Sequence, residues 1–295
     1  MGIHDKTKSV SMGTDTYRLV TWNVRGLGTY TKRYRVLALL KRLKVHIACL
    51  QETHLTEAES NKLAKKWKGQ LYAANYSSYA RGTLIWIAPA VPFRLLYLEG
   101  DINGCYISLQ GKLDGRLITI VNSYGPNIDD ENFYPEIQDL ISMDTSSPLI
   151  WAGDYNCVLD TNKDRTPPKS NTKPRMTKML QRAVSNLDLC DIWRTQNPDS
   201  KEFTCYSPTQ NTYSRLDRIY ISQSISERVF KIQHLARYIS DHAPTYMELS
   251  WGEPPYNRAL WRLNSEILLD EIGKVTISEA IEEYLTGNWG TMASR

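Results

Sequence analysis

The sequence lacks any apolar run that approaches the ~20 residues needed to span a bilayer, and no charged-then-apolar signal opens it. Cysteine is scarce: five residues at scattered positions, without a CxxC pair, indicate neither a disulfide framework nor a zinc site. No fixed-period repeat is visible. We therefore expect neither a membrane protein nor a disulfide-stapled one, but a protein of a reducing intracellular compartment.

What is present is the composition of a soluble globular chain, with 41% hydrophobic and 23% charged residues over a length sufficient for a large core. The net charge of +4 is unevenly spread. Residues 1–252 carry 32 basic against 25 acidic residues, whereas residues 253–295 carry four basic against seven acidic ones. The basic excess of the longer part favours a polyanionic partner.

Hydrophobic periodicity predicts both helices and strands in each half of the chain. Strands without strict alternation with helices indicate an α/β protein in which two mixed sheets pack face to face, with helices outside. The predicted helices cover 31–44, 57–68, 130–143 and 175–186. The predicted strands cover 17–22, 45–50, 82–88, 93–99, 105–109, 117–123, 148–152, 203–206, 216–221, 229–234 and 242–249.

Three segments are expected along the chain. Residues 1–16 are polar and without periodicity, and we interpret them as a flexible N-terminus. Residues 17–252 form the main domain, and the pair Pro254-Pro255 marks a boundary. Residues 253–295 are then a linker with helical character, in which apolar stripes predict a helix over 261–288.

Polar side chains stand at or just beyond the apolar strands, a placement that brings them to the crevice where open sheets bind ligands. Each alone fits an ordinary turn or a surface charge, but six such placements in one chain indicate a site. They are Asn23, Glu52, Asn122 with Tyr124, Asp154 with Asn156, Asp217, and Asp241 with His242.

The chemistry of this set matches metal-assisted hydrolysis of a phosphodiester. Magnesium prefers oxygen ligands and takes one or two carboxylates. Glu52 suits the first ligand, with Asn23 and Asp241 nearby. Mg²⁺ is the expected cofactor, with Mn²⁺ as an alternative.

The remaining residues suit the proton transfers and the charge of the phosphate. Asp217 can hold His242 in one tautomer and stabilise its charged form. Asp154 is then free to orient or deprotonate the attacking water. Asn156, Tyr124 and His242 can donate hydrogen bonds to the phosphate as charge builds on it.

In order along the chain, these motifs resemble the endonuclease/exonuclease/phosphatase superfamily, over roughly residues 17–251. Within that superfamily the stretches 21–27, 51–55, 213–217 and 238–242 are similar to the endonuclease of LINE-type (non-LTR) retrotransposons, an apurinic-endonuclease-like group. The piece 261–264 also resembles the segment that leads toward the reverse transcriptase of such elements.

The resemblance implies a four-layered α/β sandwich, a divalent metal, and nicking of one strand of double-stranded DNA so that its 3′ hydroxyl primes reverse transcription. It implies a reverse transcriptase in the same longer chain, and action in the nucleus after synthesis in the cytoplasm. It implies a metal role for Glu52 and catalysis by Asp154 and His242, with Asp217 orienting His242. Phosphate or site-organising roles fall to Asn23, Tyr124, Asn156 and Asp241.

Other readings remain open. Ser123 and Gly125 replace a larger apolar residue and an alanine of many relatives. The stretch 151–156 with 217–219 is also similar to inositol-polyphosphate phosphatases, although Arg215-Leu216 stands where those have Trp-Cys. Further alternatives are an abasic-site repair endonuclease and a nucleic-acid-binding module with an inactive site.

Two segments are expected to face DNA. The loop 163–178 holds six basic residues against one acid, which favours phosphate contacts. The stretch 207–213 has the composition of a hairpin tip, and its Gln210 and Asn211 could read the minor groove. The residues assigned to DNA binding are Arg165, Lys169, Lys173, Arg175, Thr204, Ser207, Gln210, Asn211 and Arg215.

Overall fold

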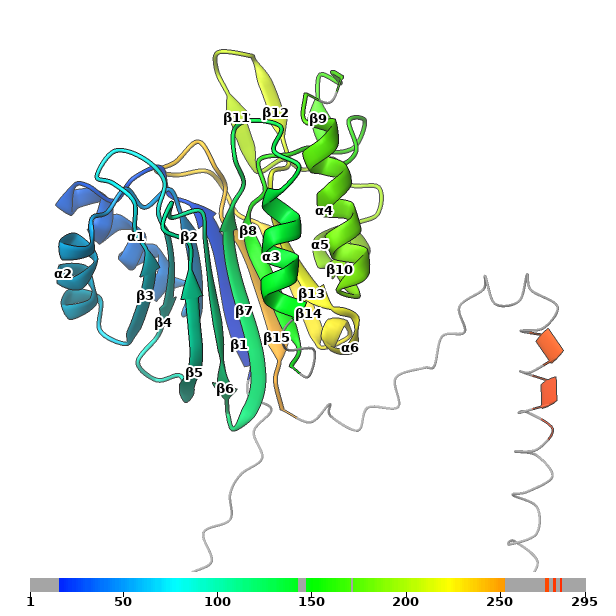
Figure 1. The fold of residues 1–295 in the computed structure, drawn as a ribbon, viewed down its shortest axis with the longest axis horizontal. Coiled ribbons are helices and arrows are strands. Elements are labelled where there is room, and N and C mark those ends of the chain that lie inside the picture. Colours follow the sequence, from blue (N-terminus) through cyan, green and yellow to red (C-terminus); the bar gives the residue numbers. More distant parts are fainter. Residues whose placement is uncertain are drawn as a thin grey trace, which may run out of the picture. The chain divides into compact units, whose positions relative to one another are not determined.

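The computed structural model describes residues 16–142, 147–170, 172–252, 274–275, 278–279 and 282 (Figure 1). The chain separates into two compact units, Met1–Pro254 and Pro255–Arg295, and the sheets and the candidate site belong to the first. The expected flexible N-terminus, the boundary at Pro254-Pro255 and nearly all of the helix expected over 261–288 lie outside the described residues, so these stay predictions. No helix in the described part is long and apolar enough to cross a membrane.

The first of two six-stranded sheets has the order β14-β15-β1-β2-β4-β3. Within it β1 pairs in parallel with β2 and antiparallel with β15, so the sheet is mixed. Its strands are β1 (Thr16–Asn23), β2 (Ile47–Gln51), β3 (Gln70–Ala74), β4 (Thr83–Ile87), β14 (Val229–His234) and β15 (Thr245–Ser250).

The second six-stranded sheet has the order β10-β13-β8-β7-β6-β5. Its β7 and β8 are parallel and the other pairs are antiparallel. Its strands are β5 (Phe93–Gly100), β6 (Tyr106–Leu113), β7 (Arg116–Tyr124), β8 (Leu149–Asp154), β10 (Leu189–Asp191) and β13 (Asp217–Ser222). A small third sheet, in the order β11-β12-β9, joins β9 (Arg165–Thr166), β11 (Cys205–Ser207) and β12 (Thr212–Ser214).

Side chains that alternate along the central strands hold the layers together, because successive residues of a strand point to opposite faces. Leu19 on β1 and Ile150 on β8 belong to the core between the two sheets. Trp22 on β1 packs outward with buried residues of the helices α1 and α2, and Trp151 on β8 packs outward with those of α3 and α4. Both faces of the central strands are therefore buried, which explains their nearly continuous apolar sequences.

Four helices form the outer layers and two short ones lie among the loops (Figure 1). The expected four-layered α/β sandwich of two mixed sheets is confirmed. The capping box of α2, in which Thr56 and Glu59 satisfy each other's backbone N–H groups, explains why that helix begins where it does. The helices are α1 (Tyr30–Arg42), α2 (Glu57–Trp67), α3 (Phe133–Ser142), α4 (Pro174–Asn186), α5 (Ile192–Gln196) and α6 (Gln223–Ser226).

The four predicted helices are present within a few residues, and the strand 229–234 has the predicted bounds. The strand predicted over 203–206 instead begins at Cys205, and the expected loop 207–213 contains parts of β11 and β12. The hairpin itself is present, with residues 208–211 at its tip. Sequence periodicity missed β3, β9, β10, β12 and the short helices α5 and α6, most of which are too brief to show a period.

Candidate active site

Strand register brings the polar clusters to one edge of the two sheets. Tyr124 at the end of β7 pairs with Asp154 at the end of β8. Asp217 opens the antiparallel strand β13 directly opposite Asp154, since an antiparallel strand begins where its neighbour ends. In the other sheet, β1 ends at Asn23 and β2 at the residue before Glu52. These polar residues thus lie at corresponding ends of neighbouring strands. Asn122 instead lies inside β7, where its amide donates to the carbonyls of Leu50 and Leu84.

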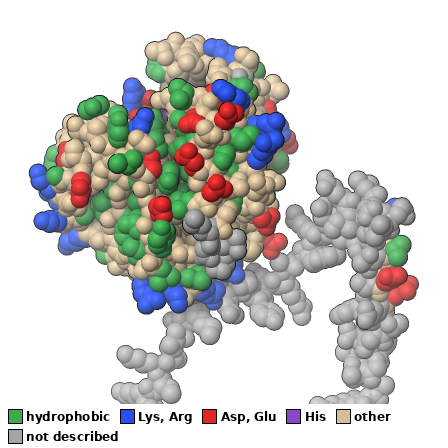
Figure 2. Space-filling model, in the orientation of Figure 1, with side chains coloured by type: hydrophobic (Ala, Val, Ile, Leu, Met, Phe, Trp, Pro, Cys, Tyr) green, Lys and Arg blue, Asp and Glu red, His purple; other side chains and the backbone are tan. Residues whose placement is uncertain are grey.

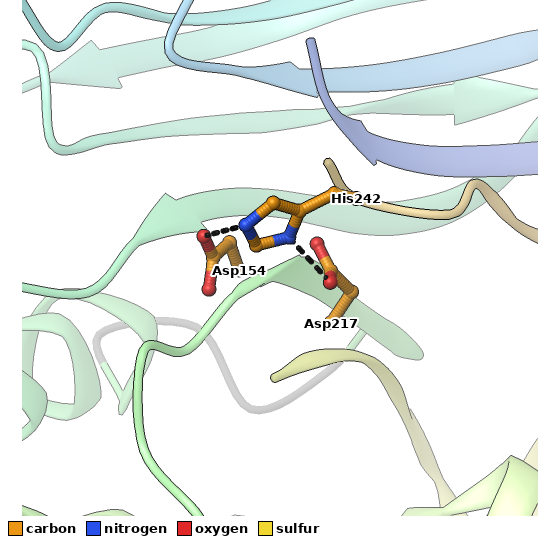
Figure 3. Close-up of side chains that lie close together, drawn as sticks. All are labelled: Asp154, Asp217 and His242. Atoms are coloured by element: carbon orange, nitrogen blue, oxygen red, sulfur yellow. Dashed lines mark hydrogen bonds and ion pairs between the residues drawn. The ribbon is translucent and has the colours of Figure 1, made fainter. Parts of the chain in front are cut away.

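Three buried side chains meet at the centre of this edge: Asp154, Asp217 and His242 (Figure 3). The Nδ1 of His242 lies 2.8 Å from an Oδ of Asp217, and its Nε2 lies 3.8 Å from an Oδ of Asp154. The imidazole therefore lies between two carboxylates, and each of its ring nitrogens faces one of them. The expected pairing of Asp217 with His242 is present in the geometry. Among the described residues, Arg215 and Arg218 form ion pairs with Asp164 and Asp191 and not with Asp217.

The charges of these groups are coupled. Burial alone lowers the pKa of His242, but the carboxylates of Asp217 and Asp154 more than offset it and hold that pKa well above its ordinary value. Burial is also the largest influence on Asp154 and raises the pKa of its carboxyl. The site therefore contains a charged imidazolium beside a carboxylate that is more basic than an exposed aspartate, a combination suited to acid–base chemistry.

Asn23 connects the two sheets through its amide. Its Nδ2 donates to Glu52 Oε1 and to Asp154 Oδ2, each at 2.9 Å, and its Oδ1 accepts from the backbone N–H of Arg25 at 3.0 Å. Glu52 has φ of +48°, a left-handed conformation that turns the chain away as β2 ends. Its other oxygen lies 3.4 Å from His54 Nε2. Asn23 therefore holds two carboxylates in place with a donor group.

Tyr124 and Asn156 lie on the other side of Asp154. Burial, followed by the nearby charges of Glu52 and Asp154, raises the pKa of the Tyr124 hydroxyl, which stays protonated and can donate. The Nδ2 of Asn156 donates to Asn127 Oδ1 at 2.6 Å. Its backbone N–H donates to Asp154 Oδ1 at 2.9 Å, in a turn that Asn156 makes with φ of +50°.

Asp241 lies at the rim rather than between the other carboxylates. Its Oδ2 lies 2.8 Å from the guanidinium of Arg25, and its Oδ1 accepts from the hydroxyl of Ser240 at 3.2 Å. Ser240 also donates to the backbone oxygen of Asn23 at 2.7 Å. Sequence reasoning assigned no role to Arg25, Ser240 or Asn127. The first two lie inside the stretches 21–27 and 238–242, but nothing in their residue type indicated a role.

The donor set fits a divalent cation. Asp154, Asp217 and His242 each offer one ligand atom, and these atoms lie within 4.8 Å of one another. The Oδ1 of Asp217 is buried and has no hydrogen-bond partner among the described residues, as expected of an oxygen reserved for a ligand. Glu52 adds a partly exposed carboxylate, and oxygen-rich sets of this kind suit magnesium. The charge on His242 argues for the carboxylates as the ligands, because an imidazolium has no lone pair to give.

The site opens into a cavity of about 680 Å³ whose walls are loops and the small third sheet. Its lining includes Tyr124, Asp154 and His242. Ser207 and Gln210 of the hairpin also line it, together with Arg165, Lys169 and Lys173. Figure 1 shows the hairpin of β11 and β12 projecting beyond the ends of the main sheets. The cavity thus joins the candidate catalytic groups to most of the residues that the sequence assigned to DNA binding.

Two of the residues assigned to DNA binding are buried instead, which corrects those assignments. Arg215 is 1% exposed and lies 2.8 Å from Asp164 and 2.7 Å from Asp191. Burial alone would raise the pKa of Asp164, but the charges of Arg218 and Arg215 hold this pKa well below its ordinary value. This ion cluster holds the loop around Asp164 in place. An arginine that is buried in such a cluster cannot contact DNA.

Thr204 is the second correction, being fully buried. Its hydroxyl accepts the backbone N–H groups of Leu216 at 3.0 Å and Asp217 at 3.1 Å. Its carbonyl accepts the N–H of Ala243 at 2.6 Å. Thr204 therefore ties the start of β13 to the segment that carries His242, and so helps to position Asp217 against His242.

The cations of the loop 163–178 differ in what they can offer to a polyanion. Lys169 is exposed, whereas Lys173 donates to the carbonyls of Pro126 and Asn156 at 3.0 and 2.7 Å. Arg175 faces Asp129 and Glu131 at 3.4 and 3.5 Å. Figure 2 shows basic side chains gathered over the region of α4, next to acidic ones, so part of the loop's charge is already compensated.

The sequence matches one protein family and is similar to individual known proteins. A match to the Endonuclease/Exonuclease/phosphatase family covers residues 20–242. The chain is 27% identical over 256 residues to the Transposon TX1 uncharacterized 149 kDa protein of Xenopus laevis. That match covers 85% of this chain and 19% of that protein, so the chain spans about a fifth of its length. It is also 23% identical to the exodeoxyribonuclease of Bacillus subtilis (strain 168), over 77% of this chain and 97% of that protein.

Solved structures show the same fold. AP endonuclease LMAP from Leishmania major superposes with a TM-score of 0.68 at 20% identity, over 85% of this chain and 92% of that one. A 3′ phosphatase, NExo, from Neisseria, bound to a product DNA hairpin, superposes with a TM-score of 0.62 at 19% identity, over 80% of this chain and all of that one.

Proposed function

Because the chain belongs to the endonuclease/exonuclease/phosphatase family, we propose that it is a metal-dependent DNA endonuclease of a LINE-type retrotransposon. It nicks one strand of target DNA and leaves a 3′ hydroxyl that primes reverse transcription. The observation that carries the proposal is the buried group in which His242 lies between Asp217 and Asp154. The similarity to a transposon protein supports the biological setting.

In the proposed reaction, water attacks the phosphorus atom, the bond to the 3′ oxygen breaks, and that oxygen takes up a proton from solvent water to become the 3′ hydroxyl. Asp154, with its raised pKa, accepts the proton of the water. His242, kept charged by Asp217, donates to a phosphate oxygen as negative charge builds there. Tyr124 and Asn156 supply further donors at the same edge. A divalent cation held by Glu52 with the neighbouring carboxylates would stabilise the charge on the phosphate and on the departing 3′ oxygen.

We further propose that the chain acts in the nucleus, with Mg²⁺ as its cation and Mn²⁺ as a substitute. A reverse transcriptase would follow in the same longer protein. The TX1 protein, about five times the length of the matched region, supports this arrangement.

The proposal is tested by nicking of supercoiled plasmid with and without Mg²⁺, followed by extension of the nicked product with a DNA polymerase. Extension requires a 3′ hydroxyl, so a nick that cannot be extended would reject the priming role. Parallel assays of phosphate release from an inositol polyphosphate and of incision at a synthetic abasic site separate the two other enzymes considered. A chain that binds plasmid but never nicks it would be a binding module.

A further inference from the structure

A groove of about 830 Å³ lies outside the catalytic cavity, between α1 and the segment 235–238. Val36 and Leu40 of α1 are fully buried against the first sheet, so the helix is fixed in place. Its Ala38 and Leu39 line the groove together with Leu235 of the facing segment. The groove therefore has apolar walls on a firmly packed support.

The charge around this groove has one sign. The helix α1 contains no acidic residue and has Lys41 and Arg42 in its last turn. Arg35 and Arg42 line the groove from the helix, and Arg237 lines it from the other side. No acidic residue lines the groove among the residues described. A polyanion with apolar parts matches such a surface in both respects.

Two tyrosines of the groove are exposed. Tyr34 on α1 is 63% exposed and Tyr238 on the facing segment is 65% exposed. Each wall of the groove thus carries one tyrosine ring, with arginines nearby. Aromatic rings on which bases stack and cations that contact phosphates are the means by which proteins bind single-stranded nucleic acid. An intact duplex keeps its bases stacked inside and would meet this groove only with its backbone.

The groove is also connected to the DNA-facing hairpin. The guanidinium of Arg237 lies 5.6 Å from the ring centre of Tyr206 and 5.1 Å from that of Tyr213, both on the hairpin. Four residues after Tyr238 the chain reaches His242. A strand that leaves the catalytic cavity past the hairpin would therefore meet Arg237 first and the groove next.

We propose that this groove binds single-stranded DNA, the strand freed beside the nick, by stacking its bases on Tyr34 and Tyr238 while Arg35, Arg42 and Arg237 contact phosphates. The inference rests on the proposed function for the origin of that strand. The binding itself needs no catalysis, so the two can be tested separately.

The test measures binding of a fluorescent oligo(dT) of about 12 nucleotides, within the usual site size of single-strand binders, by anisotropy at fixed salt. The variants are Tyr34→Ala, Tyr238→Ala and the double variant Arg35→Gln with Arg42→Gln. Tyr97→Ala is the matched control, because Tyr97 is 54% exposed on the edge strand β5 and lies outside the groove. Plasmid nicking is measured for every variant.

Each tyrosine variant is expected to weaken oligo(dT) binding by at least about fivefold, with plasmid nicking and the Tyr97→Ala control unchanged. Cross-linking of oligonucleotides that carry 5-iododeoxyuridine should label peptides within 31–43 or 235–238. Unchanged binding in the groove variants, labelling confined to the catalytic cavity, or preference for an acidic peptide over oligo(dT) would overturn the inference. If the wild type binds oligo(dT) in the groove but never nicks plasmid, the proposed function fails and the groove stands.

Discussion

His234 gives the folded chain a specific weakness in mild acid. Its ring stacks on Trp193 with centroids 4.5 Å apart, and its Nδ1 lies 2.9 Å from the hydroxyl of Thr245. Its Nε2 is buried without a hydrogen-bond partner among the described residues. Burial, followed by the charge of Arg215, lowers the pKa of His234 from 6.5 to about 4. The imidazole is therefore neutral in the folded chain at neutral pH.

The unfolded chain binds a proton at His234 near pH 6.5, whereas the folded chain binds it only near pH 4. Because the unfolded state holds more protons between these values, the free energy of unfolding falls as the pH falls. The loss from this one residue is about 2 kcal/mol at pH 5 and about 3 kcal/mol at pH 4, relative to pH 7.5. The substitution His234→Phe keeps the ring on Trp193 and removes the titration.

The measurement is urea unfolding followed by tryptophan fluorescence, in EDTA so that cation binding does not contribute, at pH 7.5, 6 and 5. Loss of the hydrogen bond to Thr245 changes the free energy of unfolding of the variant by the same amount at every pH. The change of this free energy with pH is therefore the quantity to compare between the two proteins. We expect the wild type to lose about 2 kcal/mol more than His234→Phe between pH 7.5 and 5. Parallel stability curves for the two proteins would refute the reasoning.

Four further predictions concern the site. Asp154→Ala should reduce nicking by several orders of magnitude while the chain still folds, and near wild-type nicking would remove Asp154 from catalysis. Thr204→Val should lower kcat and the free energy of unfolding, since two buried N–H groups lose their acceptor at a cost of about 1–3 kcal/mol each. Thr204→Ser keeps the hydroxyl and should retain both quantities. Equal behaviour of the two variants would contradict the positioning role. Lys169→Gln should lower the slope of log binding against log salt by about 1 on duplexes of any sequence, and an unaltered slope excludes a phosphate contact. Exchange of residues 208–212 for a Gly-Ser turn should redistribute nick sites on one plasmid at similar total activity, and an identical map would exclude the hairpin from target choice.

That the polar residues of the candidate site lie together was predictable, because most of them stand at strand ends, which can be recognised in the sequence as polar residues after apolar runs. Asp154 and Asn156 follow an apolar run, and the register of neighbouring strands brings Asp217 opposite Asp154. That the same edge also receives Glu52 from the other sheet follows from how two such sheets pack. Short polar strands leave no comparable trace, so β9 and β12 were missed.

The errors in the DNA-binding assignment have a different cause. Arg215 and Thr204 flank the hairpin, where exposed polar residues are ordinary. Their burial depends on partners far along the chain: Asp164, 51 residues from Arg215, and Ala243, beyond the end of β14. No local pattern signals a buried ion cluster of this kind, because arginine and aspartate in loops are usually solvated.

The late position of His242 in the chain has a consequence for biosynthesis. His242 lies just before β15, and β15 inserts between β14 and the N-terminal strand β1. During synthesis the first sheet therefore stays open at β1 until residues near 250 have left the ribosome. The imidazole joins Asp217 only as that last strand closes the sheet. A nascent or truncated chain that ends before Asp241 would carry Glu52, Asp154 and Asp217 but lack the imidazole, so we expect the site to stay incomplete until β15 is in place.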